Sequence, residues 1–446
     1  MASIVAALGR IKQLSLPSLQ RPAIERLCRN LGHHWRNREL DPATTLALFM
    51  QQVVHGNVPC SEVRHLACQD FSASAYCQAR SRLPLRLLQT LLKQVIDAAL
   101  PASKRREHLW HGHRTFHIDG SSFAMPDTAA LRAAFGTPSG QKPGCGFPVA
   151  HLLALFSAAT GLLLEAWASP LNTADLAFAS EAQERLRPGD VLLGDENFSG
   201  YSHLALLVQR QLHGLFPLHS GRLVDFTRCR PHTKNGKKQV AGLPRSRWIK
   251  SLGHNDQLVE YFKPKARPRW MSKEQFDALP KSIIIRELRR TVRRRGRPPL
   301  ALSMVTTLLD AIKYPAADLL KLRVRRWDVE TNLRHLKTTM KMDELHCQSE
   351  AGVRKEVAVF CLVYNLVRLV MLEGAQRQSV AVTRISFADA LKWMRHARPG
   401  RQMPMLLVNA DRPGRLEPRA VKRRWNKYPK LTRRRGRPGS KTQDLT

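Results

Sequence analysis

Apolar residues recur at helical spacing through the first hundred residues of the chain. In residues 24–35 and 44–56 they lie three or four positions apart, which is typical of amphipathic helices. Asp41 followed by Pro42 indicates a helix start, because both residue types are favoured at the beginning of a helix. The pattern predicts an all-helical N-terminal domain over residues 1–108.

From residue 115 the pattern changes to short, nearly continuous apolar runs bounded by turn residues. Such runs predict strands covered on both faces. Helical spacing returns between and after them. The predicted order is strand (115–119), strand (148–158), strand (161–169), helix (173–186), strand (191–193) and helix (201–212). This order predicts an α/β domain over residues 109–372.

A long segment, residues 212–315, interrupts this domain. Apolar and polar residues alternate at 257–264 and 282–292, so we expect a β-rich insertion. Residues 351–374 are apolar on most helical faces and predict a helix buried against the sheet. The C-terminal region, residues 373–446, ends in a basic stretch with little periodicity, which we expect to be partly disordered.

The charge of the chain narrows the choice of partner. Its 446 residues include 73 Lys+Arg and 35 Asp+Glu, a formal net charge of +38. Such a surplus predicts a polyanionic partner, with nucleic acid as the first choice. No apolar run is long enough to span a membrane and no secretory signal precedes the first helix, so we expect an intracellular protein without a membrane partner.

The cysteines and histidines raise the alternative of a zinc site. Eight cysteines contain no C-x-x-C pair, so we interpret them as reduced, packed thiols. The three groups with some resemblance to ligand sets are Cys28, His33 and His34; Cys60, His65 and Cys68; and His108, His111, His113 and His117. None has zinc-finger or ribbon spacing, so we favour packed thiols and ordinary exposed histidines over a zinc site for each group.

Three carboxylates form the strongest candidate for chemistry. Asp119 ends the first predicted strand and Asp195 ends the fourth. Glu330 lies on a predicted helix, four residues after Arg326 and seven before Lys337, so all three are expected on one helical face. Taken singly, the aspartates suit turns and the glutamate suits a surface ion pair. Together they suit a metal-assisted reaction on a phosphodiester, with carboxylates holding Mg²⁺ and cations meeting phosphate.

This constellation resembles the catalytic domain of DDE-type insertion-sequence transposases of the IS-four family. The family has a Y-x2-R-x3-E-x6-K motif around its last acid. Arg326, Glu330 and Lys337 match its spacing, whereas Arg323 stands where the family has tyrosine. The combined pattern is specific, although each block alone is not.

The segments around Asp119 and Asp195 resemble the other two blocks of the family, so the resemblance covers about residues 110–372. It implies an RNase H-like mixed sheet with flanking helices and an insertion before the last acid. It further implies that Asp119, Asp195 and Glu330 hold two Mg²⁺ ions, for which Mn²⁺ substitutes, and that Arg326 and Lys337 orient the phosphate.

The implied function is DNA cleavage and strand transfer by a transposase, through a hairpin cut-and-paste route. The implied partners are double-stranded DNA, as element ends and as target, and a second copy of the chain on the paired ends. The implied location is the bacterial cytoplasm, at the nucleoid. Two alternatives remain: a degenerate protein that binds DNA without cutting it, and a nuclease of the same fold that cuts without joining.

Further residues are candidates for DNA contact. Residues 71–84 resemble half of a helix pair with Arg80 and Arg82 outward, although a merely supporting bundle fits equally well. The sequence Arg-Arg-Arg-Gly-Arg-Pro occurs twice and resembles an AT-hook or a generic basic loop. Aromatic residues of the insertion could stack on a displaced base or pack in the core. The candidates are Arg80, Arg82, Trp248, Trp270, Arg293, Arg295, Arg297, Arg323, Arg433, Arg435 and Arg437.

Overall fold

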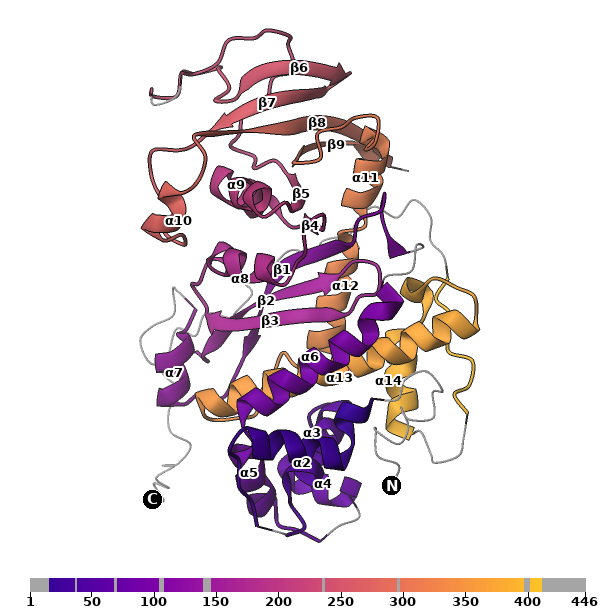
Figure 1. Ribbon diagram of the computed structural model, residues 1–446. Coiled ribbons are helices and arrows are strands. Elements are labelled where there is room, and N and C mark those ends of the chain that lie inside the picture. Colours follow the sequence, from indigo (N-terminus) through magenta and orange to yellow (C-terminus); the bar gives the residue numbers. More distant parts are fainter. Residues whose placement is uncertain are drawn as a thin grey trace, which may run out of the picture.

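The computed structural model describes residues 16–36, 38–67, 70–103, 108–138, 146–234, 237–294, 297–396 and 402–410. A sheet runs through its centre and upper part, with helices covering its lower end (Figure 1). The sheet has nine strands in the order β3-β2-β1-β4-β5-β9-β8-β7-β6. Its first half positions the candidate site.

Five strands form this first half of the sheet. They are β1 (Thr115–Ala124), β2 (Val149–Ser157), β3 (Leu163–Pro170), β4 (Val191–Leu193) and β5 (His213–Pro217). β2 is antiparallel to β1 and β3, whereas β4 is parallel to β1 and β5. This is the RNase H-like mixed sheet that the sequence predicted.

Two local predictions in this sheet were wrong. The first strand does not end at a turn after Asp119: β1 continues to Ala124 and pairs with β2 from Phe116↔Ser157 to Ala124↔Val149. Phe123 explains the continuation, since it is 2% exposed and anchors the second half of the strand in the core. The expected helix over 173–186 is divided into a 3₁₀ turn, η3 (Asp175–Phe178), and α8 (Ala179–Glu184).

The insertion is β-rich, as predicted, and continues the same sheet. Its elements are β6 (Arg247–Gly253), β7 (Asp256–Phe262), α10 (Lys273–Asp277), β8 (Ser282–Arg294) and β9 (Arg297–Thr306). β9 pairs with both β5 and β8. Because β5 lies within the predicted insertion, the β-rich addition begins after this strand and not at residue 212.

A buried ion pair ties the insertion to the helices that follow it. Arg286 on β8 donates to both carboxylate oxygens of Asp256, at 2.8 and 2.6 Å, and to the carbonyl of Tyr314 at 2.7 Å. Arg286 is fully buried and Asp256 is 3% exposed, and breaking a pair this deep costs several kcal/mol, about 3–5. Tyr314 leads directly into α11 (Ala316–Val324), so this contact fixes where α11 begins.

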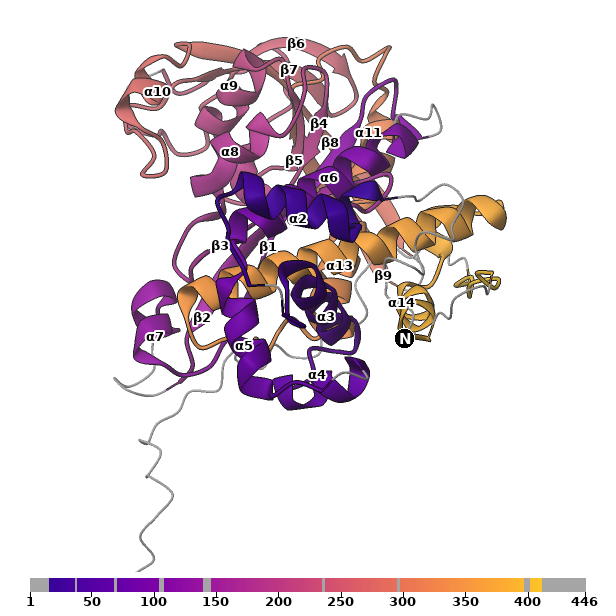
Figure 2. The same cartoon turned by 60° about the horizontal axis from the view of Figure 1, so that its bottom comes forward.

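The long helix α13 (Glu350–Arg377) is buried against the sheet, as predicted, and the N-terminal helices cover its other side. It is long and apolar enough to cross a membrane by length and composition, but 94% of its most apolar window is buried inside the protein. In Figure 2 the N-terminal helices lie in front of it. The other helices of this part are α2 (Arg21–Asn30), α3 (Pro42–Val54), α4 (Cys60–Ala67), α5 (Ala73–Arg82), α6 (Leu85–Ser103), α7 (Ala129–Phe135) and α14 (Phe387–His396).

The N-terminal domain is helical, as predicted, and Asp41 caps α3. Its side chain accepts a hydrogen bond from the Thr44 amide at 2.8 Å, with Pro42 in the first turn. The domain is joined to the rest through Glu356 of α13, which is fully buried. Glu356 accepts from Asn57 at 2.7 Å and from the Cys347 amide at 2.9 Å. The helical and α/β parts therefore share one hydrogen-bonded core.

Candidate active site

Arg326 joins the first and last candidate carboxylates. It lies in the short break between α11 and α12 (Trp327–Arg334). Its Nη1 donates to Asp119 Oδ2 at 3.1 Å, and its Nη2 donates to Glu330 Oε1 at 3.2 Å. The Arg326 side chain is only 13% exposed. Residues about two hundred positions apart in the sequence thus meet where α12 packs on β1.

Asp195 belongs to the same cluster. It follows β4, the parallel neighbour of β1, and caps the 3₁₀ turn η4 (Glu196–Ser199). Its Oδ1 accepts from the Asn197 amide and its Oδ2 from the Asn197 side chain, both at 2.9 Å. Its charge raises the pKa of Asp119, and Arg326 lowers the pKa of both aspartates. The two acids and the guanidinium therefore share one electrostatic site.

All three carboxyl groups have raised pKa values. Burial is the largest cause for Asp119, Asp195 and Glu330, and the positive charge of Arg326 opposes it in each case. Keeping these acids ionised where their pKa values are raised lowers the free energy of unfolding. Such perturbed pKa values are concentrated at functional sites, and a bound divalent cation would offset the cost.

This cost gives a testable dependence on pH. The pKa of Asp119 is raised in the folded protein. The stability that its protonated form contributes is therefore fully present below the pKa of the unfolded chain, about 3.9, and is lost as pH rises through the pKa of the folded protein. Asp119→Asn cannot ionise, so its thermal midpoint should exceed that of the wild type at neutral pH. The difference should vanish in acid. A lower midpoint for the variant at neutral pH would mean that the Arg326 pair outweighs burial.

Arg323, which stands at the tyrosine position of the family motif, interacts electrostatically with the same acids. Burial lowers its pKa to about 10, and the charges of Asp119, Asp195 and Glu330 oppose that effect. Its Nε is buried and has no hydrogen-bond partner among the described residues. A second guanidinium therefore lies beside the acidic cluster, available to an added anion.

Lys337 is placed differently from the prediction. Arg326, Glu330 and Lys337 were expected on one α-helix, but α12 ends at Arg334 and Lys337 lies in a π-helical turn, His335–Thr339. A π-helical turn does not keep the 3.6-residue period on which the prediction of one shared face rested. Arg326 itself precedes the helix. The three residues of the motif therefore lie in three backbone segments: the break before α12, α12 itself and the π-helical turn.

Asp175 and His151 lie beside the cluster and were missed by the sequence analysis. Asp175 opens η3 and His151 lies on β2, with Asp175 Oδ1 2.6 Å from His151 Nε2. The sequence analysis placed Asp175 in a predicted helix. Its contact with β2 comes from residues far away in the chain, so no sequence pattern near Asp175 indicates it. Both Asp195 and Asp119 help to raise the pKa of Asp175 to about 6, after burial.

Arg80 does not point outward, so that prediction was wrong. It is 7% exposed and donates to Gln52 at 2.8 Å and to the Cys347 sulfur at 2.9 Å. Its guanidinium also lies 4.0 Å from the Phe49 ring centroid. These contacts bury the side of α5 that carries Arg80 and hold it against the core. Arg82 is exposed at the end of the same helix.

The other DNA-contact candidates are dispersed. Trp270 packs against the core of the α/β domain, and Trp248 is half-buried on β6. The first arginine-rich repeat joins β8 to β9, which places Arg293 and Arg297 on the two strands flanking the hairpin tip. Arg295, the second repeat with Arg433, Arg435 and Arg437, and the rest of residues 411–446 lie outside the described residues.

A known protein family matches the part of the chain that carries this site. A family model described as "Transposase DDE domain" matches residues 110–366. The chain belongs to the DDE transposase family. It is 27% identical over 384 residues to the transposase InsG for insertion sequence element IS4 of Escherichia coli (strain K12), spanning 80% of this chain and 78% of InsG. It is 29% identical over 147 residues to InsZ of the same strain, spanning 32% of this chain and 49% of InsZ.

Among solved structures, the chain aligns with a piggyBac transposase synaptic complex with hairpin DNA at a TM-score of 0.42 and 9% identity, over 90% of this chain and 83% of that one. The family match and the InsG alignment confirm the resemblance to IS-four transposases drawn from the motifs. This DDE transposase is therefore a DNA-processing enzyme of an insertion sequence.

Divalent metal ions serve the chemistry of this family, and the donor chemistry of the cluster fits them. Carboxylate oxygens are the ligands that Mg²⁺ prefers, and Asp119, Asp195 and Glu330 supply them in an electrostatically coupled group. Within the described residues, no three His, Cys, Asp or Glu side chains are yet close enough to form a ligand set. Arg326 occupies the position between Asp119 and Glu330 and neutralises them there.

Proposed function

We propose that this DDE transposase cleaves the ends of its element and joins them to target DNA, using Asp119, Asp195 and Glu330 as ligands of two Mg²⁺ ions. The observation that carries the proposal is that Arg326 contacts Asp119 on β1 and Glu330 on α12, and that its charge also acts on Asp195 at the end of β4. When bound, the ions would activate the attacking water or 3′-hydroxyl and stabilise the leaving oxygen.

The chain's own residues would orient the substrate. Arg326 contacts Asp119 and Glu330 through both terminal nitrogens, so neutralisation of these acids by other cations would release it towards a phosphate oxygen. Arg323 adds a second guanidinium at the cluster. Lys337, from the π-helical turn, would be the third cation on the scissile phosphate. Their shared task is to hold the phosphodiester in line for attack.

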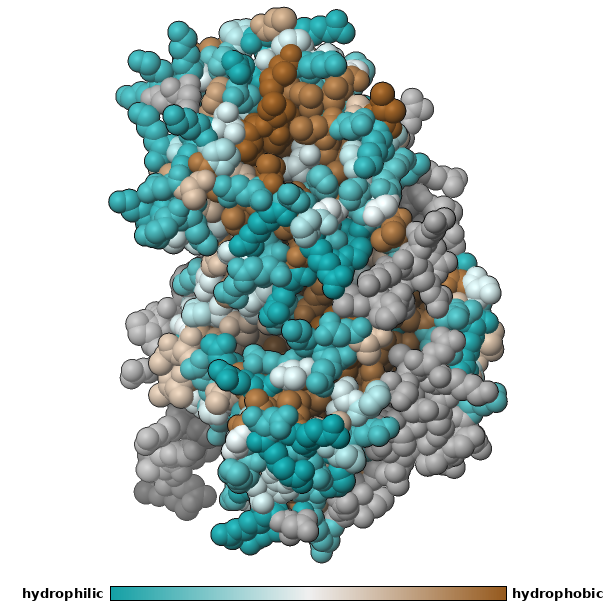
Figure 3. Space-filling model, viewed as in Figure 1, coloured by the Kyte–Doolittle hydropathy of each residue, from teal (hydrophilic) through white to brown (hydrophobic). Residues whose placement is uncertain are grey.

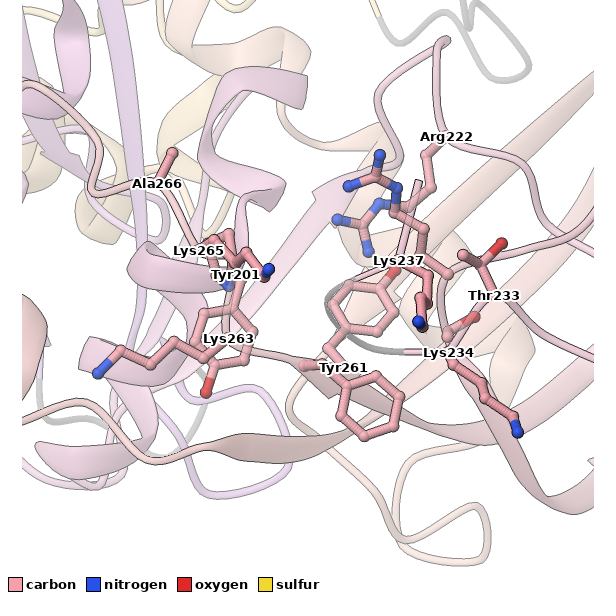
Figure 4. A pocket seen from close by; sticks show the side chains of 13 residues that line it. Tyr201, Arg222, Thr233, Lys234, Lys237, Tyr261, Lys263, Lys265 and Ala266 are labelled. Carbon is pink, nitrogen blue, oxygen red and sulfur yellow. The ribbon is translucent and has the colours of Figure 1, made fainter. Parts of the chain in front are cut away.

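DNA would also be held by the insertion. A cavity of about 440 Å³ opens between α9 (Tyr201–Gln209) and β7, and no acidic residue lines it. Figure 4 shows basic side chains on both sides of the tyrosine rings. The cavity residues used here are Tyr201, Arg222, Lys234, Lys237, Arg245, Tyr261 and Lys265. Basic rims with aromatic floors suit a nucleic-acid strand.

The floor of this cavity is rigid. Tyr261 is 3% exposed, and its hydroxyl donates to the buried Glu287 at 2.7 Å. Gln257 donates to the other oxygen of Glu287 at 2.9 Å. The Arg222 guanidinium lies 3.9 Å from the Tyr261 ring centroid. We assign this cavity to the DNA backbone, through its basic side chains, and keep the partly exposed Trp248 and Trp270 as the candidates for stacking on a displaced base.

The lysines of the cavity allow a direct test. Replacing Lys234, Lys237 and Lys265 together by glutamine should lower the slope of log K against log salt for end binding by about 0.9 for each phosphate that these lysines neutralise in the wild type. The matched control replaces three exposed lysines elsewhere, Lys93, Lys273 and Lys321. Equal slopes for the two triple variants would exclude the cavity from DNA binding.

The formal net charge of +38 agrees with a nucleic-acid partner. The face in Figure 3 is mostly hydrophilic, with apolar patches over the insertion sheet.

We further propose that two copies act on paired ends, since double-strand cleavage at two ends requires both to be held. A hairpin route of cleavage and a nucleoid location complete the proposal.

A strand-transfer assay separates the proposed function from its alternatives. The full chain, end DNA, target DNA and Mg²⁺ should give nicked ends and joined products. Cleavage without joining would indicate a nuclease of the same fold. A gel shift without cleavage in Mg²⁺ or Mn²⁺ would indicate a protein that only binds DNA.

A further inference from the structure

Asp175 and His151 form a buried polar pair that the proposed mechanism does not use. The Asp175 Oδ1 atom lies 2.6 Å from His151 Nε2, and the two side chains are 18% and 13% exposed. Asp175 enters from η3, which follows β3, and His151 from the middle strand β2. His151 lies at ion-pair distance from this carboxylate, and its positive charge, when it is protonated, offsets part of the cost of burying Asp175.

The pair packs against the backbone beside Asp119. A Cβ atom added to Gly120 would lie 2.6 Å from Asp175 Oδ1 and 3.1 Å from His151 Nε2. The Gly120 amide in turn donates to Asp119 Oδ1 at 3.0 Å. The Asp-Gly sequence that resembled a turn thus has another reason: residue 120 must lack a side chain so that Asp175 can approach the active-site strand.

The position of Asp175 is electrostatically part of the active site. The charges of Asp195 and Asp119 both act on its carboxyl group, in the same direction as burial, and so raise its pKa. The cations near these acids are Arg326 and Arg323. A His-Asp pair with a purely structural task has no need to lie where the charges of two other carboxylates reach it, because this repulsion destabilises the fold.

We propose that Asp175 is a positioning residue of the active site. Its carboxylate, held by His151 against Gly120, adds a fourth negative charge around Asp119 and Asp195 and strengthens the binding of divalent cations. This inference rests on the proposed function of these two aspartates. Groups that surround metal ligands without replacing them change metal affinity about 10- to 100-fold.

The test measures metal binding without DNA and without catalysis. Free Mn²⁺ is titrated by electron spin resonance against the full chain, as wild type, Asp175→Asn and Glu184→Gln. Glu184 is the matched control, since it lies close in sequence but is 64% exposed and pairs with Arg210. We expect Mn²⁺ binding about tenfold weaker in Asp175→Asn and unchanged in Glu184→Gln. Wild-type affinity in Asp175→Asn would overturn the inference.

A second experiment tests the same inference without relying on Asp175→Asn alone. Gly120→Ala should displace the Asp175 carboxylate and weaken Mn²⁺ binding, but should add little in an Asp175→Ala background, where space is available. Equal effects in both backgrounds would overturn the inference, and this comparison remains if Asp175→Asn does not fold.

Asp119→Asn distinguishes failure of the inference from failure of the proposed function. Mn²⁺ binding that survives Asp119→Asn contradicts the proposed function and the inference with it. Binding that is lost in Asp119→Asn but kept in Asp175→Asn contradicts the inference alone.

Discussion

Asp119→Asn, Asp195→Asn and Glu330→Gln are each expected to abolish cleavage of element ends, by at least about 10³-fold, while leaving end binding intact. The reason is that each variant keeps the size of the side chain and removes one anionic ligand from the site, and metal ligation is worth several kcal/mol in phosphoryl transfer. The measurement is single-turnover cleavage of labelled end DNA, with a gel shift on the same preparations.

Asp277→Asn is the matched control for these variants, because Asp277 is an exposed acid on α10 in the insertion. It should cleave at the wild-type rate. Near-wild-type cleavage by one of the three site variants would show that the substituted residue is not catalytic. Weak end binding by a variant would show that the substituted residue has a structural role instead.

Arg326→Ala is expected to lower cleavage by about 10²- to 10³-fold, comparable with the loss of one preorganised donor at a reacting oxyanion. Arg326 is the residue through which Asp119 and Glu330 meet, and it is placed to pass to the phosphate when these acids bind other cations. Arg326→Lys should recover only part of the rate, since one ammonium cannot reproduce a two-pronged contact.

The control for Arg326 is Arg325→Ala, which removes the exposed arginine at the preceding position. Cleavage rate, end binding and thermal midpoint should be measured together. Equal losses in Arg325→Ala and Arg326→Ala, or full cleavage by Arg326→Ala, would contradict the assigned role. A loss confined to Arg326 and to the cleavage step would support it.

Much of the fold could be predicted from the sequence because its information is local. Buried strands were found as continuous apolar runs, and α13 as a helix without a polar face. The continuation of β1 past Gly120 was missed, since glycine and two serines favour a turn. Only the pairing with β2, and the burial of Phe123, reveal why the strand continues.

The candidate site shows the same limit. Asp195 could be named because it follows an apolar strand, and Glu330 because of its motif spacing, whereas Asp119 was named from a strand end that the structure does not have. Arg80 was expected outward because its own helix has no strong apolar face, but contacts with Gln52 and Cys347 bury it. Asp175 was missed because its partners, His151 and Gly120, come from other strands. Such contacts have no pattern in the local sequence.

The most direct test of the proposed chemistry is to locate the bound cations. Crystals of the transposase with end DNA and Mn²⁺ should be measured for anomalous scattering at the manganese edge. We predict anomalous peaks within bonding distance of the carboxylate oxygens of Asp119, Asp195 and Glu330, with Arg326 moved from these acids to the phosphate. Manganese bound elsewhere, with Arg326 still between Asp119 and Glu330, would contradict the proposal.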